Sequence, residues 1–421
     1  MKLASKKTAG LRATLMAGAA CLGLFVGCHH ADTTPDPEPQ YTIDQTLSDE
    51  AQRNTIAFDG LGFLTGCLGG QSFLPPGKVA DFSGFQFLRD NDPTDMGHNT
   101  AFVTIIAFNI LHILSSSQID QLVQSAQTQV SLINDYAYQR FPLMDAFRRQ
   151  LEGDIPSGSS GLNHDSVVAY SGRLYEIDGQ ISYNRSRLMS SILGSLNSSQ
   201  RKALAALKGL DGVGKWDTTL ADPLQDRQLD KDVKVAVMTY ASEMYAWYAG
   251  SVDADVYFCP ERQGTYFGSF YLKDWPAMGN PNYSIDEQLT ARAGTTFLAA
   301  LADSQRALVT GLVDVQKSDL NAIVEARRDI SEELRQFLAG AVVDSATVLR
   351  LSRHYGELDG EIVYNYATHF AQVGQSLSTA QQTRLTVLAD SLGYVAPTGT
   401  FLYSEPAAMP SVPNTDFLFA R

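Results

Sequence analysis

The side chains that carry most enzyme chemistry are few in this sequence and do not form a recognised catalytic pattern. The chain has 421 residues, with seven histidines and four cysteines. It contains no His-Glu-x-x-His or Cys-x-x-Cys metal motif, no Gly-x-Ser-x-Gly turn for a nucleophilic serine, and no glycine-rich phosphate loop followed by lysine. The sequence therefore predicts a protein that is not an enzyme and needs no cofactor.

Two weaker patterns could still carry chemistry. Met96 lies two residues before His98, and a thioether beside an imidazole suits a soft metal ion, so these two are weak metal candidates. Cys67 and Cys259 stand in two separate aromatic-rich segments. In an oxidising compartment they could form a disulfide, and two buried free thiols are the alternative. The sequence leaves that choice open.

The first 27 residues (1–27) resemble a secretory signal that ends at a lipidated cysteine. An apolar stretch follows a basic start and ends in Val26-Gly27-Cys28, which resembles the bacterial lipobox. An ordinary secreted protein, cleaved nearby, is the alternative. Because His29 rather than an aspartate follows Cys28, we expect a periplasmic protein anchored to the outer membrane through that cysteine. The basic residues of the signal are Lys2, Lys6, Lys7 and Arg12.

The net charge of the chain excludes one large class of partners. It is −14 for the whole sequence and becomes −18 once the four basic residues of the signal are removed. A general nucleic-acid binder needs a basic surface that displaces counterions, so we expect no nucleic-acid partner. The Pro- and Asp-rich segment 28–55 favours extended backbone and predicts a tether. No later stretch has the ~18–20 consecutive apolar residues of a spanning helix.

The body of the chain contains two related halves, which we place at 56–215 and 250–395. A connecting segment, 216–249, lies between them, and a C-terminal tail, 396–421, follows. The halves align at an offset of 187, which becomes 181 beyond an insertion in the first half. We therefore predict a tandem duplication with a pseudo-twofold relation. Matched residues include Gln118 with Gln305, Gln129 with Gln316, Arg140 with Arg327, Arg148 with Arg335, and Tyr183 with Tyr364.

Each half has the spacing of long amphipathic helices, so the predicted fold is mainly α, a repeated unit of long-helix hairpins. Apolar residues over 119–151 predict one helix, which Pro142 should kink in the first half only, because Asp329 replaces it in the second. The Gly-, Pro- and aromatic-rich stretches 58–99 and 251–284 do not have helical patterns. Further helices are predicted at 166–194, 200–208, 345–374 and 381–392, and at 229–249 with Met238 and Met244 inward.

Four short sites share a pattern of leucine, three small or polar residues, and glutamine. This spacing predicts a capping box, in which a Ser or Asn oxygen accepts from an exposed amide one turn on and the glutamine reaches back. The third site has Ala302 where the capping oxygen is needed, so we expect that box to be broken or shifted to Asp303. The sites are 114–118, 196–200, 301–305 and 377–381.

The arrangement of these sites resembles the LTxxQ motif of the Spy/CpxP family of periplasmic proteins, whose members also carry two copies per helical unit. The resemblance covers about 114–208 and 301–392, and the motif's threonine is absent from every copy. It implies long, bent antiparallel hairpins that pair into a cradle. It also implies roles such as an ATP-independent chaperone, a regulator of envelope stress signalling, or a metal-responsive protein. Two copies in one chain would resemble a covalently joined pair of subunits.

The resemblance directs attention to arginines, because the chaperone member of the family has a basic, partly apolar concave face that attracts acidic, unfolding clients. Arg140 and Arg148 are eight residues apart and share a helix face, as do Arg327 and Arg335. We predict these four as client-binding candidates; arginines that flank the core or form ion pairs are the alternative. The expected function is a non-catalytic periplasmic holdase or stress-response protein that binds unfolded or partner envelope proteins. A metal- or small-ligand-sensing module is the alternative.

Overall fold

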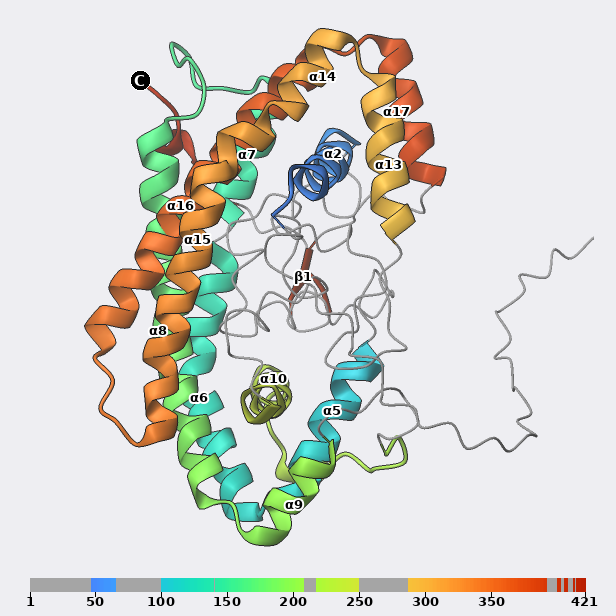
Figure 1. Ribbon diagram of the computed structural model, residues 1–421. Helices are drawn as coiled ribbons and strands as arrows, with labels where there is room; N and C mark the ends of the chain where they lie inside the picture. The colour runs from blue at the N-terminus through green and yellow to red at the C-terminus, as the bar shows by residue number, and fades with distance from the viewer. Residues whose placement is uncertain are drawn as a thin grey trace, which may run out of the picture. The chain divides into compact units, whose positions relative to one another are not determined.

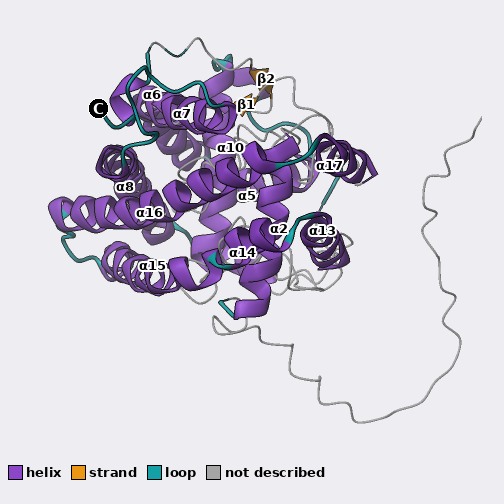
Figure 2. Ribbon diagram, turned by 90° about the horizontal axis from the view of Figure 1, so that it is seen from above, coloured by secondary structure: helices purple, strands orange, loops and turns teal. Residues whose placement is uncertain are grey.

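The computed structural model describes residues 47–65, 100–139, 141–207, 217–249, 287–391, 400–402, 405–407, 412 and 414–421. Most of these residues are helical (Figure 1 and Figure 2), so the fold is mainly α, as predicted. The predictions for the signal at 1–27, for Cys28, Cys67, Met96, His98, Arg140 and Cys259, and for the segment 251–284 lie outside the described residues.

The helices form two successive series. The first series consists of α2 (Asp49–Thr65), α5 (Thr100–Ile113), α6 (Ser116–Gln139), α7 (Phe141–Glu152), α8 (His164–Ser195) and α9 (Ser198–Leu207). The second consists of α10 (Lys231–Ala249), α13 (Glu287–Ala300), α14 (Asp303–Thr310), α15 (Leu312–Arg335), η4 (Gln336–Ala339), α16 (Ser345–Ser376) and α17 (Thr379–Ser391). The remaining elements are η2 (Gln225–Arg227), η5 (Asp416–Leu418) and the antiparallel pair β1 (Thr400–Leu402) and β2 (Glu405–Ala407).

Several elements of the two series match at the offsets found in the sequence, although α14 and α15 break at Gly311, where the corresponding part of α6 is continuous. Helices α5 and α13 contain 14 residues each, and their first residues, Thr100 and Glu287, are related by the first offset. Helices α8 and α16 contain 32 residues each, and the second offset relates their starts. Gly153 follows α7 and Gly340 follows η4. Both glycines have φ of 75°, a left-handed conformation that favours glycine.

The predicted helices at 166–194, 200–208, 229–249, 345–374 and 381–392 are confirmed. Helix α2 corrects two other predictions, because it begins inside the predicted tether (28–55) and continues into the stretch 58–99 that lacks a helical pattern. Helix α15 is continuous through Asp329, as expected. In the first half, α6 ends at Gln139 and α7 begins at Phe141. Because Arg140 is not described, the kink at Pro142 stays a prediction.

Helices α8 and α16, one from each half, pack lengthwise against each other. Gly360 of α16 approaches Ser171 near the start of α8, and Gly179 of α8 approaches Ser352 near the start of α16. The helices are therefore antiparallel, and the two contacts are reciprocal because each pair of residue types recurs at the second offset. The absence of a side chain at both glycines permits the close approach. The described residues belong to one compact unit.

Helices α2 and α10 exchange places between the halves. Helix α2 is the first helix of the first series but packs on α13 to α17, whereas α10 is the first helix of the second series but packs on α5, α6 and α8. Figure 1 shows both helices nearly end-on, each inside the bend of the helices that hold it. The two helices also share a pattern of burial at an offset of 181. The matched buried residues are Gln52 with Val233, Ile56 with Val237, Ala57 with Met238, Asp59 with Tyr240, Gly60 with Ala241, and Phe63 with Met244.

Candidate binding site

The capping motifs of the first half meet each other in space. The amide of Ser115 donates to Gln118 Oε1 at 2.8 Å, and the amide of Asn197 donates to Gln200 Oε1 at 3.0 Å. In return, the side-chain oxygens of Ser115 and Asn197 accept from the backbone N–H groups of Gln118 and Gln200 at 3.3 and 2.9 Å. Gln200 Nε2 then donates to Gln118 Oε1 at 2.7 Å. Two capping boxes are therefore linked through their glutamines.

The second half repeats this link. Gln381 Nε2 donates to Gln305 Oε1 at 2.7 Å, and Ser378 and Gln381 form a complete box. At the third site the amide of Ala302 still donates to Gln305 Oε1 at 2.8 Å, but alanine offers no capping oxygen. Asp303 is the first residue of α14 and does not take the cap position. The third box is therefore half-formed, which agrees with the expectation of a broken box and not with a shift to Asp303.

The glutamines also bind the ends of the preceding helices. Gln200 Nε2 donates to the carbonyl oxygen of Ile113 at 3.0 Å, and Gln381 Nε2 donates to that of Ala300 at 3.1 Å. Each glutamine pair therefore joins the C-terminal end of one helix to the N-termini of two others. The side-chain amides of the motif glutamines are occupied by these contacts and are therefore not free to bind a ligand. They stabilise the connections between these helices instead.

Helices α13 to α17 bend around α2, and the surface with which they contact it is called the seat of α2. Ile56, Ala57, Leu61 and Phe63 are buried there, with no more than 4% of any side chain exposed. Gly60 fits against the rings of Phe297 and Phe370, where an added Cβ would come within 3.0 Å of Phe370. The seat is thus apolar and closely shaped to a helix.

Polar contacts fix the register of α2 in this seat. Tyr366 donates its hydroxyl to Gln316 Oε1 at 2.6 Å, and Gln316 Nε2 donates to Gln52 Oε1 of α2 at 2.9 Å. At the surface, Lys317 Nζ lies 2.8 Å from Asp49 Oδ1. This contact lowers the pKa of Asp49 and raises that of Lys317.

The seat of α10 in the first half is also mainly apolar. Val237, Ala241 and Met244 are fully buried, and Met238 is 7% exposed, so the methionines face inward as predicted. Asn134 of α6 donates to Asp232 at the start of α10 at 3.3 Å. Both seats therefore bury an apolar helix face and pin its first turn with a polar contact.

The three candidate client-binding arginines that are described, Arg148, Arg327 and Arg335, do not form a shared accessible basic face. Arg327 is fully buried, with its guanidinium carbon 5.8 Å from the ring centroid of Tyr355, so its predicted contact with a client is wrong for the folded chain. Arg148 pairs with Asp145 at 2.6 Å and Glu152 at 3.1 Å, which neutralise its charge. Arg335 is half-buried. These positions agree better with arginines that flank the core.

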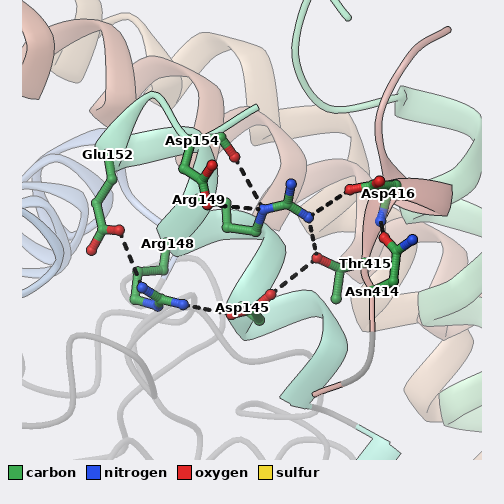
Figure 3. A network of polar contacts seen from close by, with 8 residues as sticks. All are labelled: Asp145, Arg148, Arg149, Glu152, Asp154, Asn414, Thr415 and Asp416. Atoms are coloured by element: carbon green, nitrogen blue, oxygen red, sulfur yellow. Dashed lines mark hydrogen bonds and ion pairs between the residues drawn. The ribbon is translucent and has the colours of Figure 1, made fainter. Parts of the chain in front are cut away.

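The C-terminal segment is clamped to the first half (Figure 3). Arg149 Nη1 donates to Thr415 Oγ1 and to Asp416 Oδ1, both at 2.9 Å. The hydroxyl of Thr415 donates to Asp145 Oδ2 at 3.0 Å. The guanidinium of Arg149 also lies 4.8 Å from the ring centroid of Phe419. A single arginine of α7 thus holds the C-terminal segment at both ends of η5.

The insertion in the first half, in the region 157–164, also holds the C-terminal segment. The amide of Asn163 donates to the carbonyl oxygen of Leu418 at 2.7 Å, and the amide of Ala420 donates to that of Gly161 at 2.8 Å. Leu418 is fully buried. The insertion that changes the offset between the halves therefore supplies backbone partners for the end of the chain.

One histidine links the halves electrostatically. His164 Nε2 lies 2.6 Å from Glu361 Oε2 of α16, and His164 Nδ1 lies 2.9 Å from Asp165 Oδ1. The hydrogen bonds to Asp165 and Glu361 raise the pKa of His164. The ring packs edge-on against Tyr364, with 5.1 Å between centroids.

No described helix is long and apolar enough to cross a membrane. No group of three or more His, Cys, Asp or Glu side chains in the described ranges is placed to hold a metal ion. Comparison of the chain with protein-family models, curated proteins and solved structures finds no match.

The residues that differ between the halves were not among the predicted site residues. Arg149 matches Gln336 at the offset of 187, and Arg185 matches Tyr366 at the offset of 181. Such differences between otherwise aligned positions were a usable signal. His164 carried no local signal of its contact, because its partner Glu361 lies in the other half of the sequence.

Proposed function

We propose that this protein is a non-catalytic, holdase-type binding protein of the bacterial envelope, held at the outer membrane through lipidated Cys28. Its partners are unfolded envelope proteins that expose apolar helix faces. One observation supports this proposal above the others: each helical bend holds a helix that belongs to the other series. The bends are thus already occupied by helices in the way that a groove binds an amphipathic helix.

The chemistry of the seats defines the expected clients. Burying a side chain such as Ile56 or Phe63 contributes about 1.5–3 kcal/mol, so a client helix with a similar apolar face would gain comparable energy. Because Arg148 and Arg327 are paired or buried, recognition depends on apolar faces rather than on the acidity of the client. In this respect the proposal differs from a basic cradle.

The resemblance to the Spy/CpxP family supports the same function. The four glutamine motifs cap helices in linked pairs at the bends. A signal followed by a lipobox-like Cys28 supports the envelope location. In the resting chain α2 and α10 would protect the apolar seats, and a client would bind when one of them leaves its seat.

Aggregation of a chemically denatured client protein, diluted into buffer and followed by light scattering, tests the proposal. The full mature chain should suppress scattering, whereas an unrelated acidic protein at the same concentration should not. The double variant Ile56→Ala, Phe63→Ala loosens α2 and should suppress scattering more strongly. Arg53→Ala, at an exposed position of the same helix, is the matched control and should behave like wild type. No suppression by wild type or loosened chain at several-fold excess would contradict the proposal.

A further inference from the structure

The two halves place different residues at one matched buried position, Arg185 in α8 and Tyr366 in α16. In the second half the position is fully satisfied, because Tyr366 donates to Gln316, which donates to Gln52. Tyr366 also lies near the buried Asp59 of α2, whose negative charge adds to burial in raising the pKa of Tyr366. This half therefore combines a neutral side chain with an acid on the inserted helix.

The first half has the opposite composition. Arg185 is 1% exposed, and its Nε, Nη1 and Nη2 atoms have no hydrogen-bond partner among the described residues. A guanidinium carries five N–H donors and a permanent charge. Burial of such a group without a partner costs several kcal/mol. The position therefore requires an acceptor, and a negatively charged one would compensate it best.

The described residues around Arg185 do not supply that charge. Gln129 of α6 matches Gln316 at the offset of 187, and its Oε1 is buried without a partner in the described part of the chain. One neutral oxygen can accept from only part of the guanidinium. Asp178 is on the same helix, but it lies seven residues before Arg185, so the two backbone positions are about 10 Å apart along the helix axis.

On the inserted helix, Tyr240 replaces the acid. Tyr240 of α10 matches Asp59 of α2 at the offset of 181, and its buried hydroxyl has no partner among the described residues. Burial raises the pKa of Tyr240, and the nearby positive charge of Arg185 acts in the opposite direction. A neutral phenol close to the guanidinium is a second hydrogen-bond donor. As far as the chain is described, the site therefore has donors and positive charge without an acid.

We propose that Arg185 and Tyr240 bind a small oxyanion, a carboxylate or a phosphate, between α6, α8 and α10. The planar guanidinium donates two parallel hydrogen bonds to such a group, and the phenol donates a third. The anion takes the place that Asp59 holds in the other half. Because α10 covers the site, binding requires α10 to lift, and the bound anion then holds α10 in its seat.

Thermal unfolding of the full mature chain tests this inference, with sodium acetate or sodium phosphate added against sodium chloride at equal ionic strength. One of the two anions should raise Tm by several degrees in a saturable way, because a ligand that binds only the folded state stabilises it. The arm that responds identifies the class of anion. The response should disappear in Arg185→Tyr and persist in Arg353→Met, a variant at an exposed, ion-paired arginine. Equal Tm values in all salts, or a response retained in Arg185→Tyr, would overturn the proposal.

Hydrogen exchange on the wild-type chain provides a second test that does not depend on a variant that folds. The effective anion should slow the exchange of amides in α10 several-fold and leave those in α2 unchanged. Because α2 has its own acid, it serves as the internal control. Equal slowing of both helices would indicate general stabilisation and would contradict the site.

Discussion

The first and second halves share their helices but differ where they meet. Tyr175 of α8 and Gly356 of α16 occupy matched positions and also contact each other, since a Cβ on Gly356 would lie 2.5 Å from Tyr175 Cβ. Tyrosine at both positions would not fit. The difference shows that two positions matched by the offset of 181 can need different residues when they contact each other. Away from this contact, the glutamine pairs remain nearly the same.

The largest expected effect is at this contact. Gly356→Ala should lower the free energy of unfolding by about 3 kcal/mol, because the new methyl group would also come within 2.7 Å of the Ser171 carbonyl oxygen. Gly194→Ala in α8 is the matched control. Its Cβ would meet nothing within 4 Å, so the change should be neutral or stabilising by up to about 1 kcal/mol. Equilibrium urea unfolding measures both. Equal effects would contradict the close packing of α8 on α16.

The next largest effect is expected at Arg149, which contacts the C-terminal segment, whereas the matched Gln336 does not contact the described residues of that segment. Arg149→Met should release the C-terminal segment and cost about 2 kcal/mol, because hydrogen bonds to a charged group are lost from a side chain only 15% exposed. Gln336→Met changes the matched, exposed position and should have little effect. Hydrogen exchange of 414–421 reports the release directly. Unchanged protection in Arg149→Met would show that the clamp does not hold the tail.

A smaller effect concerns the one unequal pair of caps. Ala302→Ser should stabilise the chain by about 1 kcal/mol, because it restores an oxygen that can accept at the N-terminus of α14. Ser115→Ala, at the matched cap of α6, should destabilise it by a similar amount. Thermal unfolding of the two variants should shift Tm in opposite directions. Shifts of the same sign would mean that the two capping sites are not equivalent.

The smallest effect depends on pH. The folded pKa of His164 is raised, so its contact with Asp165 and Glu361 stabilises the fold fully below the unfolded value of about 6.5 and is lost as pH rises through the folded pKa. The difference in stability between wild type and His164→Gln should therefore be largest in mild acid. We expect about 0.5 kcal/mol, because the side chain is 43% exposed. A difference that grows with increasing pH would refute this contact.

Much of the fold could be predicted from the sequence, because helices leave a local record. The offsets of 187 and 181 located matched helices, and the glutamine spacing located their caps. Helix α2 was missed because Gly60 and Gly62 lie in a Gly-rich stretch, and the small size of Gly60 is useful only against rings from the other half. The packing of α2 on the second series and of α10 on the first could not be predicted, because no local sequence pattern indicates it.

The candidate site was harder to predict for a similar reason. The spacing of Arg327 and Arg335 shows that they share a helix face, but spacing does not tell which face is covered. Burial of Arg327 depends on α15 packing against α16, which is a tertiary property. Arg185 could have been found by comparing matched positions, because a charge opposite a tyrosine in a repeat is unexpected.

The exchange of α2 and α10 has a consequence for the order in which the chain folds. Ribosomes release a chain from its N-terminus, so α2 emerges long before α13 to α17, which begin only at Glu287. The first half can close on α10 as soon as that helix follows. Contacts so distant in sequence form slowly, and an apolar helix without its seat is open to aggregation. The first described helix to be made is therefore the last to be covered.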